Sequence, residues 1–298
     1  MKIGISGGTG FIGQYFIKEF IKDNQFFVIT SKRNHENLYQ NKNVHYVTEE
    51  YTKEGFKKAF SDCDAVVHLG AKRSNKEAEQ HIESYFDNIK TSEELFMACS
   101  ELGIKNVVNI SSTAVYDKET EYPFSEKNSV NPLSYYGSAK LMVENIAHLF
   151  NQRKQMNIKS LRIAQVMGVG ERGGYMLSIF LERCLNQEVL NVFGEGKSGK
   201  EYIYVKDVAR AIYCAIQAQD KRGIYNIGSG EITTNKELAE AFCDIFKNRA
   251  GYELLLDKKE PLDKYLMDVT FAKKELNFET KYSLHDSLKD MKAMLDQE

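Results

Sequence analysis

Three glycines near the start of the chain constrain its fold more than any other feature. Gly7, Gly10 and Gly13 recur at intervals of three residues, directly after a short apolar run over 2–6. The apolar residues that follow recur at helical spacing, so the glycines connect a strand to a helix. In that context the first glycine permits a tight turn, the second lets a pyrophosphate approach the helix N-terminus, and the third lets helix and strand pack closely. The pattern predicts a dinucleotide-binding loop.

The rest of the first 163 residues alternates short apolar runs with helical periodicity. Strands are predicted at 26–30, 44–47, 65–69, 106–110 and 158–163, and helices at 77–102 and around 138–153. Such alternation is typical of an α/β fold with a Rossmann-type, doubly wound parallel sheet covered on both faces.

Beyond residue 164 the pattern changes to frequent glycines and short elements, with helices expected at 205–218, 235–246 and 284–295. We therefore expect a smaller, interwoven C-terminal substrate lobe. The dinucleotide-binding domain is predicted at 1–163 plus about 200–226, and the substrate-binding lobe at 164–199 and 227–298. The glycine-rich segment 194–199 lacks the strand-loop-helix order of a phosphate loop, so it is interpreted as a hairpin of this lobe.

Composition narrows the partners. A net charge of -2 argues against nucleic acid, and no apolar run is long enough to span a membrane. The five cysteines have neither metal nor redox spacing, so no metal is expected, and they favour a reducing compartment. The first residues lack the charged lead and apolar stretch of a secretory signal, so we expect no such signal. We expect a cytoplasmic protein.

The end of the second predicted strand bears on the choice of cofactor. An NAD site expects an acidic residue there, which would bind the ribose 2′-hydroxyl. This chain has Ser31, Lys32 and Arg33 instead, and these groups suit a 2′-phosphate. The cofactor is therefore NAD or NADP, with local chemistry favouring NADP; the alternative is that the two cations form a solvated turn.

Tyr136 and Lys140 lie four residues apart at the start of a predicted helix, on one of its faces. A cation near the phenol favours the phenolate, so we expect the pKa of Tyr136 to fall from about 10 towards neutrality. Such a tyrosine can exchange a proton with an alcohol during hydride transfer. The pair alone occurs often by chance on surface helices. However, Ser111, Ser112 and Thr113 lie at the carboxyl end of a predicted strand, where open α/β sheets bind ligands.

Together these features resemble the extended short-chain dehydrogenase/reductase superfamily, and within it the NAD-dependent epimerase/dehydratase group that acts on nucleotide sugars. The matching segments are 7–13, 68–71, Asn88, 111–116, 131–140, Leu161–Arg162, 194–196, 204–209 and 225–228, in that order along the chain. The resemblance implies that Tyr136 is the acid/base, that Lys140 holds it and the cofactor ribose, and that Ser112 hydrogen-bonds the reacting oxygen. His68 is expected to fill its strand rather than catalyse.

The resemblance also implies the surrounding sites. The cofactor would contact Gly7, Gly10, Phe11, Ile12, Gly13, Ser31, Lys32, Arg33, Leu69, Gly70, Ala71, Asn88, Tyr136 and Lys140. A nucleotide-diphosphate sugar would contact Arg73, Ser112, Thr113, Gln165, Arg172, Val192 and Lys200. Asn88 would bridge a helix and the cofactor loop, and a homodimer would form through the helix of Lys140.

The residues beside Ser112 limit the reaction. Sugar 4,6-dehydratases of the group carry acids at the positions of Thr113 and Ala114, and enzymes that epimerise carbons 3 and 5 carry a cysteine at the second. The resemblance therefore implies a 4-epimerase, which oxidises C4 transiently and returns the hydride. A 4-keto-sugar reductase using NADP is the alternative; a reductase of non-sugar carbonyls and a non-catalytic cofactor sensor are less favoured.

The substrate side departs from the group. Gln165 replaces an asparagine that contacts the nucleotide sugar, and Lys200 replaces an arginine that clamps the diphosphate. Lysine can neutralise a phosphate but lacks the bidentate fork of arginine. Arg172 is a second candidate for the diphosphate or else a solvated loop charge. The identity of the sugar therefore stays open.

Overall fold

The structure is a computed structural model, and it describes residues 1–31, 38–75, 77–117, 122–260 and 264–297. Its centre is a sheet of seven parallel strands in the order β10-β6-β5-β4-β1-β2-β3. The strands are β1 (Lys2–Ser6), β2 (Gln25–Thr30), β3 (Val44–Thr48), β4 (Ala65–His68), β5 (Asn106–Ser112), β6 (Asn157–Ile163) and β10 (Gly223–Ile227). The expected doubly wound parallel sheet is confirmed.

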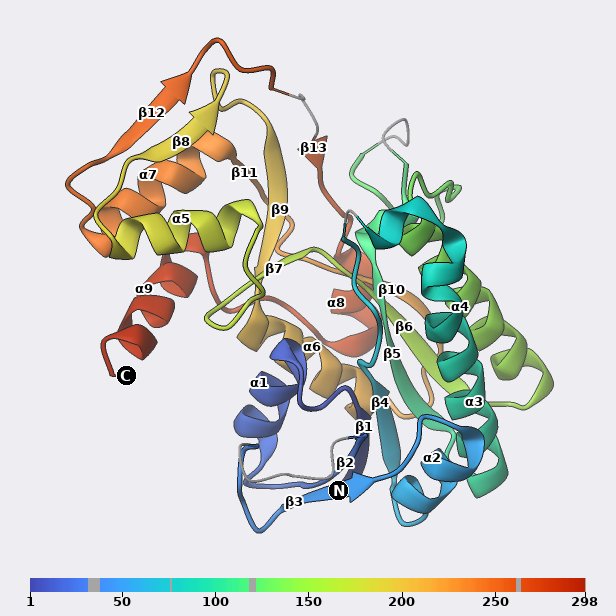
Figure 1. Cartoon of the computed structure of the whole chain (residues 1–298). Coiled ribbons are helices and arrows are strands. Elements are labelled where there is room, and N and C mark those ends of the chain that lie inside the picture. Colours follow the sequence, from blue (N-terminus) through green and yellow to red (C-terminus); the bar gives the residue numbers. More distant parts are fainter. Residues whose placement is uncertain (32–37, 76, 118–121, 261–263, 298) are drawn as a thin grey trace.

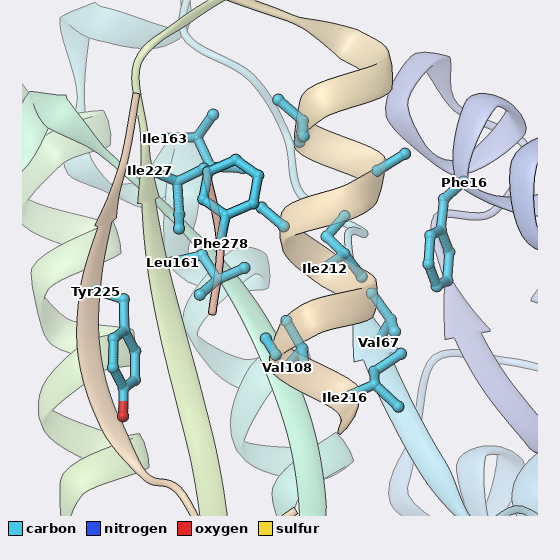
Figure 2. Packing of buried hydrophobic residues seen from close by; sticks show 14 of the residues in the cluster. Phe16, Val67, Val108, Leu161, Ile163, Ile212, Ile216, Tyr225, Ile227 and Phe278 are labelled. Carbon is cyan, nitrogen blue, oxygen red and sulfur yellow. The ribbon is translucent and has the colours of Figure 1, made fainter. Parts of the chain in front are cut away.

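Helices cover both faces of this sheet (Figure 1). One face carries α1 (Phe11–Phe20), α6 (Val205–Gln217) and α8 (Thr270–Leu276), and the other carries α2 (Lys53–Phe60), α3 (Phe86–Leu102) and α4 (Tyr135–Arg153). Burial on both faces explains why strands such as Ala65–His68 are buried at every position. In Figure 2, Ile212 and Ile216 of α6 point into the core between Phe16 and the sheet residues Val67 and Val108.

The strand order fixes where a ligand can bind. The chain winds outward from β1 to β3 and then returns to β4 on the other side of β1, so the winding direction reverses between β1 and β4. Open sheets bind ligands at such a reversal, beyond the carboxyl ends of the strands. The loops after β1 and β4, which begin at Gly7 and Leu69, lie there.

The smaller lobe packs two further sheets against helices. One sheet contains β7 (Gln165–Met167), β9 (Gly199–Tyr204), β11 (Ile232–Thr234) and β13 (Lys264–Tyr265), and the other pairs β8 (Leu190–Phe193) with β12 (Tyr252–Leu255). The helices are α5 (Met176–Leu185), α7 (Asn235–Phe246) and α9 (Leu284–Leu295). Three short 3₁₀ turns complete the described elements: η1 (Ala78–Gln80), η2 (Ile82–Tyr85) and η3 (Thr113–Val115).

Three details differ from the sequence-based expectations. The helix expected over 77–102 begins only at Phe86, because His81 is extended (φ -145°) and leaves two 3₁₀ turns before it. The segment 194–199 is not a hairpin, since β8 pairs with β12 whereas β9 pairs with β7, β11 and β13. Gly194 and Gly196 instead make room for the side chains of Glu260 and Lys236, respectively, which are distant in sequence. Local sequence patterns cannot predict such contacts.

The two-part division of the chain stays a prediction, but the structure shifts its details. Strand β9, expected in the dinucleotide-binding domain, belongs to a sheet of the smaller lobe. Helix α8, expected in the substrate lobe, packs against β10 and α6 instead. Along the parts of the chain that the structure describes, the helices are all too short or too polar to cross a membrane.

Candidate active site

The glycine loop is built for close backbone approach. Gly7 has a φ of +75°, and a Cβ on it would lie 2.6 Å from the backbone nitrogen of Gly70. A Cβ on Gly13 would lie 2.6 Å from Gly8 Cα, so the first turn of α1 packs directly on the loop. These two close approaches explain the glycines and hold the loops after β1 and β4 together at the reversal point.

The N-terminus of α1 suits an anion. The helix begins after Gly10, which supplies no side-chain cap, and its first turn contains no acidic residue. The first backbone N–H groups of a helix lack partners within it and carry the positive end of its dipole. A pyrophosphate bound there would supply these partners, so the residues present fit a nicotinamide dinucleotide.

The second half of the site lies at the carboxyl end of β5. Ser112 ends this strand, and Tyr136 and Lys140 lie in the first turns of α4. A Cβ on Gly137 would lie 2.1 Å from the carbonyl oxygen of Ala114, so only glycine lets α4 approach the 3₁₀ turn η3, directly after β5, this closely. The Ser112 hydroxyl lies close enough to the Tyr136 phenol to oppose the rise of its pKa. The three predicted catalytic residues therefore lie together.

The electrostatics of Tyr136 differ from the expectation. Burial raises the pKa of its phenol, and this effect exceeds the opposing influences of Arg73 and Ser112. The expected lowering by Lys140 is wrong for this structure, because the Lys140 ammonium donates a hydrogen bond to the Ile110 carbonyl at 2.7 Å and lies 5.7 Å from the ring centroid of Tyr136. Burial also lowers the pKa of Lys140 to about 8.

A cleft of about 750 Å³ joins the two halves. Its lining includes Gly7, Gly10, Phe11, Ile12, Gly13, Leu69, Gly70, Ala71, Arg73, Ser112, Thr113, Tyr136, Lys140, Gln165 and Lys200, all of them predicted site residues. The cleft is thus continuous from the glycine loop, past Tyr136, to the smaller lobe.

Other predicted contacts lie elsewhere. Val192 is buried in the core of the smaller lobe, because side chains alternate along β8 and Val192 faces inward, so it is no part of the cleft lining. Arg172 is exposed and Ser31 follows β2 on the surface; neither lines the cleft. Lys32 and Arg33 lie outside the described residues, so the structure does not bear on the expectation for NADP.

Asn88 and His68 have packing roles next to the cleft. The Asn88 amide accepts a hydrogen bond from Lys72 N at 2.7 Å and donates one to Lys72 O at 2.9 Å, so it fixes the loop after β4 without lining the cleft. The His68 ring lies between the hydroxyls of Ser6 and Ser92, at 2.5 and 2.9 Å. Burial lowers the pKa of His68 to about 3, so it is neutral under ordinary conditions, as a strand-filling residue should be.

Two carboxylates in the site escaped sequence reasoning. Glu79 accepts hydrogen bonds from the backbone N–H groups of Tyr135 and Tyr136, at 3.0 and 3.2 Å, and so caps the start of α4. Glu171 lines the cleft 3.6 Å from Arg73, and burial raises the pKa of its carboxyl to about 7. A single glutamate in a polar segment does not indicate helix capping or a place in a cleft. The one sequence feature that pointed to Glu171 is its position next to Arg172, a predicted substrate contact.

Known proteins resemble this chain along its whole length. A UDP-N-acetylglucosamine 4-epimerase from Bacillus cereus has a crystal structure that superposes with a TM-score of 0.89 at 30% identity, covering 99% of this chain and 96% of that one. An uncharacterized UDP-glucose epimerase from Bacillus subtilis is 28% identical over 99% of this chain and 98% of its own length. The dTDP-4-dehydro-6-deoxyglucose reductase of Escherichia coli is 26% identical, over 79% of each chain.

The family model for the NAD dependent epimerase/dehydratase family matches residues 3–228. This range begins in β1, ahead of the glycine loop, and ends just after β10, so it contains the whole parallel sheet and all three predicted catalytic residues. The chain belongs to the NAD dependent epimerase/dehydratase family.

Proposed function

We propose that the protein is a nucleotide-sugar 4-epimerase that uses a bound nicotinamide dinucleotide. The observation that carries the proposal is the single cleft in which the glycine loop faces Ser112, Tyr136 and Lys140. Two relatives with nearly complete coverage are named as a UDP-N-acetylglucosamine 4-epimerase and a UDP-glucose epimerase, which favours a UDP-sugar as the substrate.

A nicotinamide dinucleotide held by the glycine loop would supply hydride transfer at carbon 4 of the sugar, whose configuration inverts when the 4-keto form is reduced from the opposite face. Tyr136 would accept the proton of the 4-hydroxyl as the carbonyl forms, and would give the proton back as the hydride returns. Ser112 would donate a hydrogen bond to the same oxygen and hold it near the phenol. The Lys140 ammonium, fixed by the Ile110 carbonyl, would hold the cofactor ribose beside Tyr136.

The side chains next to Ser112 argue against dehydration. Thr113 and Ala114 form the 3₁₀ turn η3 at this point and offer no carboxylate to move a second proton. Of the residues that the structure describes, two acidic ones line the cleft: Glu171 pairs with Arg73, and Glu201 accepts hydrogen bonds from the backbone N–H groups of Gly230 and Met267. Oxidation and reduction at carbon 4 alone need no acid or base besides Tyr136.

The test is incubation with UDP-glucose, UDP-galactose and the two corresponding N-acetylated sugars, in the presence of NAD. Interconversion without net change in nicotinamide absorbance is the expected result. A reductase would instead consume NADPH with a 4-keto sugar, the reaction class of the E. coli relative. No turnover of any nucleotide sugar by the folded, cofactor-loaded protein would overturn the proposal.

The preference between NAD and NADP rests on Lys32 and Arg33, and it favours NADP on local charge. Dissociation constants for both cofactors, measured for the natural chain and for Arg33→Ala, decide it. Equal affinities that the substitution leaves unchanged would remove the preference.

We further propose a cytoplasmic homodimer formed through α3 and α4. Large apolar side chains are exposed on these two adjacent helices, at Phe86 and Met97 on α3 and at Met142 and Leu149 on α4. Exposed apolar patches mark protein interfaces. Sedimentation that finds only monomer at micromolar concentration would refute the dimer. The five free thiols suit the reducing cytoplasm.

A further inference from the structure

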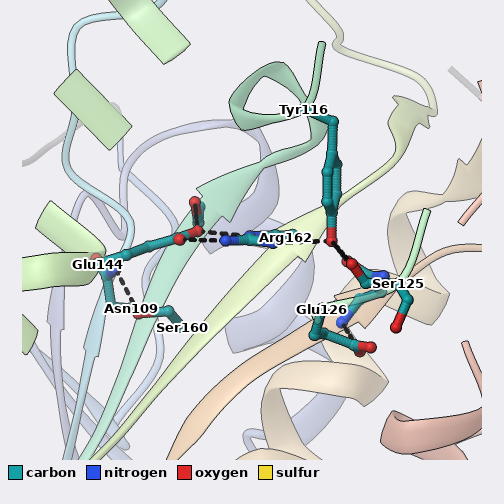
Figure 3. Close-up of polar contacts among 9 residues, drawn as sticks. Asn109, Tyr116, Ser125, Glu126, Glu144, Ser160 and Arg162 are labelled. Carbon is teal, nitrogen blue, oxygen red and sulfur yellow. Dashed lines mark hydrogen bonds and ion pairs between the residues drawn. The ribbon is translucent and has the colours of Figure 1, made fainter. Parts of the chain in front are cut away.

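A buried ion pair lies directly behind the proposed catalytic residues. Glu144 of α4 and Arg162 of β6 are each 2% exposed, and they form two hydrogen bonds, Nε to Oε1 at 2.9 Å and Nη2 to Oε2 at 2.6 Å. Ser111 of β5 donates a third hydrogen bond to Glu144 Oε1 at 2.5 Å. Figure 3 shows the Glu144 carboxylate and the Arg162 guanidinium pointing at each other. One carboxylate therefore joins a helix to two strands.

The network continues beyond the ion pair. Arg162 Nη1 donates to the Tyr116 hydroxyl at 2.8 Å (Figure 3). That hydroxyl donates to Asn226 Oδ1, also at 2.8 Å. Buried polar groups of this kind are stable only when their partners are in place. Glu144 is therefore held directly by Ser111 and Arg162, and Arg162 is held in turn by Tyr116.

The register of the elements links this junction to the active site. Ser111 and Arg162 are cross-strand partners, so both side chains leave the sheet on the α4 side. The next residue, Ser112, alternates to the cleft. On α4, Lys140 precedes Glu144 by one helical turn and Tyr136 precedes it by two. Anchoring Glu144 to Ser111 thus sets the distance between Ser112 and the two α4 residues.

We infer that Glu144 is a positioning residue of this active site: its carboxylate fixes α4 against β5 and keeps the neighbouring Lys140 ammonium charged. The inference rests on the proposed function, because it concerns the state of Lys140 in that reaction. Lys140 is almost completely buried, and its ammonium donates to the Ile110 carbonyl. An uncompensated buried cation would lose its proton, and a carboxylate one turn away opposes that loss.

The charges around Lys140 leave this role to Glu144. Its surroundings contribute Tyr136 and Glu144 from α4, His68 from β4, Glu79 from η1 at the helix start, and Arg162 from β6 behind Glu144. His68 is neutral, and Arg162 is a cation. Burial lowers the pKa of Lys140 to about 8, and Glu144 is the group that raises it.

The test compares Glu144→Gln with the double variant E144Q/R162Q. Glutamine keeps the shape but removes the negative charge, so the pKa of Lys140 should fall by on the order of one pH unit. Breaking one half of a buried pair is destabilising, whereas removing both halves leaves no unpaired charge. The double variant therefore stays informative if the single variant does not fold. Asp207→Asn is the matched control: Asp207 is a buried carboxylate paired with Arg210, remote from the cleft.

Two readouts separate this inference from the proposed function. The ¹³Cε shift of Lys140, assigned with Lys140→Arg, gives its titration in the protein without substrate. The second readout is the pH profile of kcat/KM for epimerisation. Glu144→Gln should titrate Lys140 at lower pH, and its alkaline limb should move with it, leaving about fivefold lower kcat/KM than the natural chain at pH 8 and less difference at pH 6. The double variant also loses the Arg162 cation, which lies behind Glu144, so its shift should have the same direction but a smaller size.

A Lys140 titration that is unchanged in both variants overturns the inference, even if stability and activity fall, because it reduces Glu144 to packing. A shift of the same size in Asp207→Asn also overturns it. If the natural chain shows no epimerisation while the Lys140 titration moves in the Glu144 variants alone, the proposed function fails and the charge relation between Glu144 and Lys140 stands.

Discussion

Glu171 destabilises the folded protein when it ionises, and the size of this effect follows from its surroundings. Its side chain is 4% exposed, and burial raises the pKa of its carboxyl from 4.5 to about 7. Arg73 lies 3.6 Å away but is 44% exposed, so solvent screens its charge and burial dominates. At about 1.4 kcal/mol per pH unit, this difference corresponds to about 3 kcal/mol.

The sign follows from proton binding. Below pH 4.5 the carboxyl is protonated in both the folded and the unfolded chain, so it has no effect on stability through ionisation. As pH rises to about 7, the unfolded chain has lost the proton while the folded chain holds it, and stability declines. Above pH 7 the loss is complete. Glu171→Gln should therefore be close to neutral near pH 5 and should raise the free energy of unfolding by up to about 3 kcal/mol at pH 8.

Urea unfolding of the natural chain and of the variant at pH 5 and pH 8, followed by circular dichroism, measures this directly. Glu182→Gln is the matched control, since Glu182 is exposed on α5 and its replacement should change neither value. If Glu171→Gln lowers stability at pH 8, or changes it equally at both pH values, the ion pair with Arg73 outweighs burial and the reasoning is refuted.

Three further predictions concern single residues. Tyr136→Phe should lower kcat about 10²- to 10⁴-fold while leaving NAD affinity unchanged; activity that persists would sink the proposed mechanism. Gly137→Ala should reduce both kcat and the thermal midpoint, because its Cβ would lie 2.1 Å from Ala114 O, whereas Gly173→Ala, with open space around it, should change neither. Lys159→Met should stabilise the protein more at pH 6 than at pH 9, measured by urea unfolding. Burial lowers the pKa of Lys159 from 10.5 to about 7, so the destabilisation is complete below pH 7 and declines as pH rises towards 10.5; an equal effect at both pH values would contradict this.

The features that could be predicted from the sequence are those with a local physical signature. The glycine loop needs a strand before it and a helix after it, and both can be recognised from periodicity within 20 residues. Tyr136 and Lys140 share a helix face by spacing alone, and Ser112 ends a strand that such sheets place beside a ligand. Parallel strands align these ends at one edge, so their proximity follows from the topology.

The features that could not be predicted depend on contacts between distant segments. Glu79 precedes Tyr135 by 56 residues in the sequence. It caps α4 only because the two 3₁₀ turns bring it beside Tyr135 in space. Val192 is apolar and could line a cleft, but it lies in β8, which pairs with β12, and its side chain points into the core. The pKa of Tyr136 is raised, whereas the spacing of Tyr136 and Lys140 predicted that it is lowered. Burial, which residue spacing does not report, exceeds the effect of the nearby Arg73 cation.

The same kind of distant contact ties the smaller lobe to the sheet. Asp207, fully buried at the start of α6, accepts backbone hydrogen bonds from Lys281 and Tyr282 at 2.9 to 3.1 Å. Three residues earlier, Tyr204 donates to Asp290 of α9 at 2.5 Å. The segment just before α9 is therefore fastened to α6, and α9 itself is fastened to β9 of the smaller lobe. These hydrogen bonds are buried or partly buried, so breaking them should expose the core rather than open a hinge. We therefore expect substitutions of Asp207 to lower the free energy of unfolding, and to lower activity only because less protein is folded.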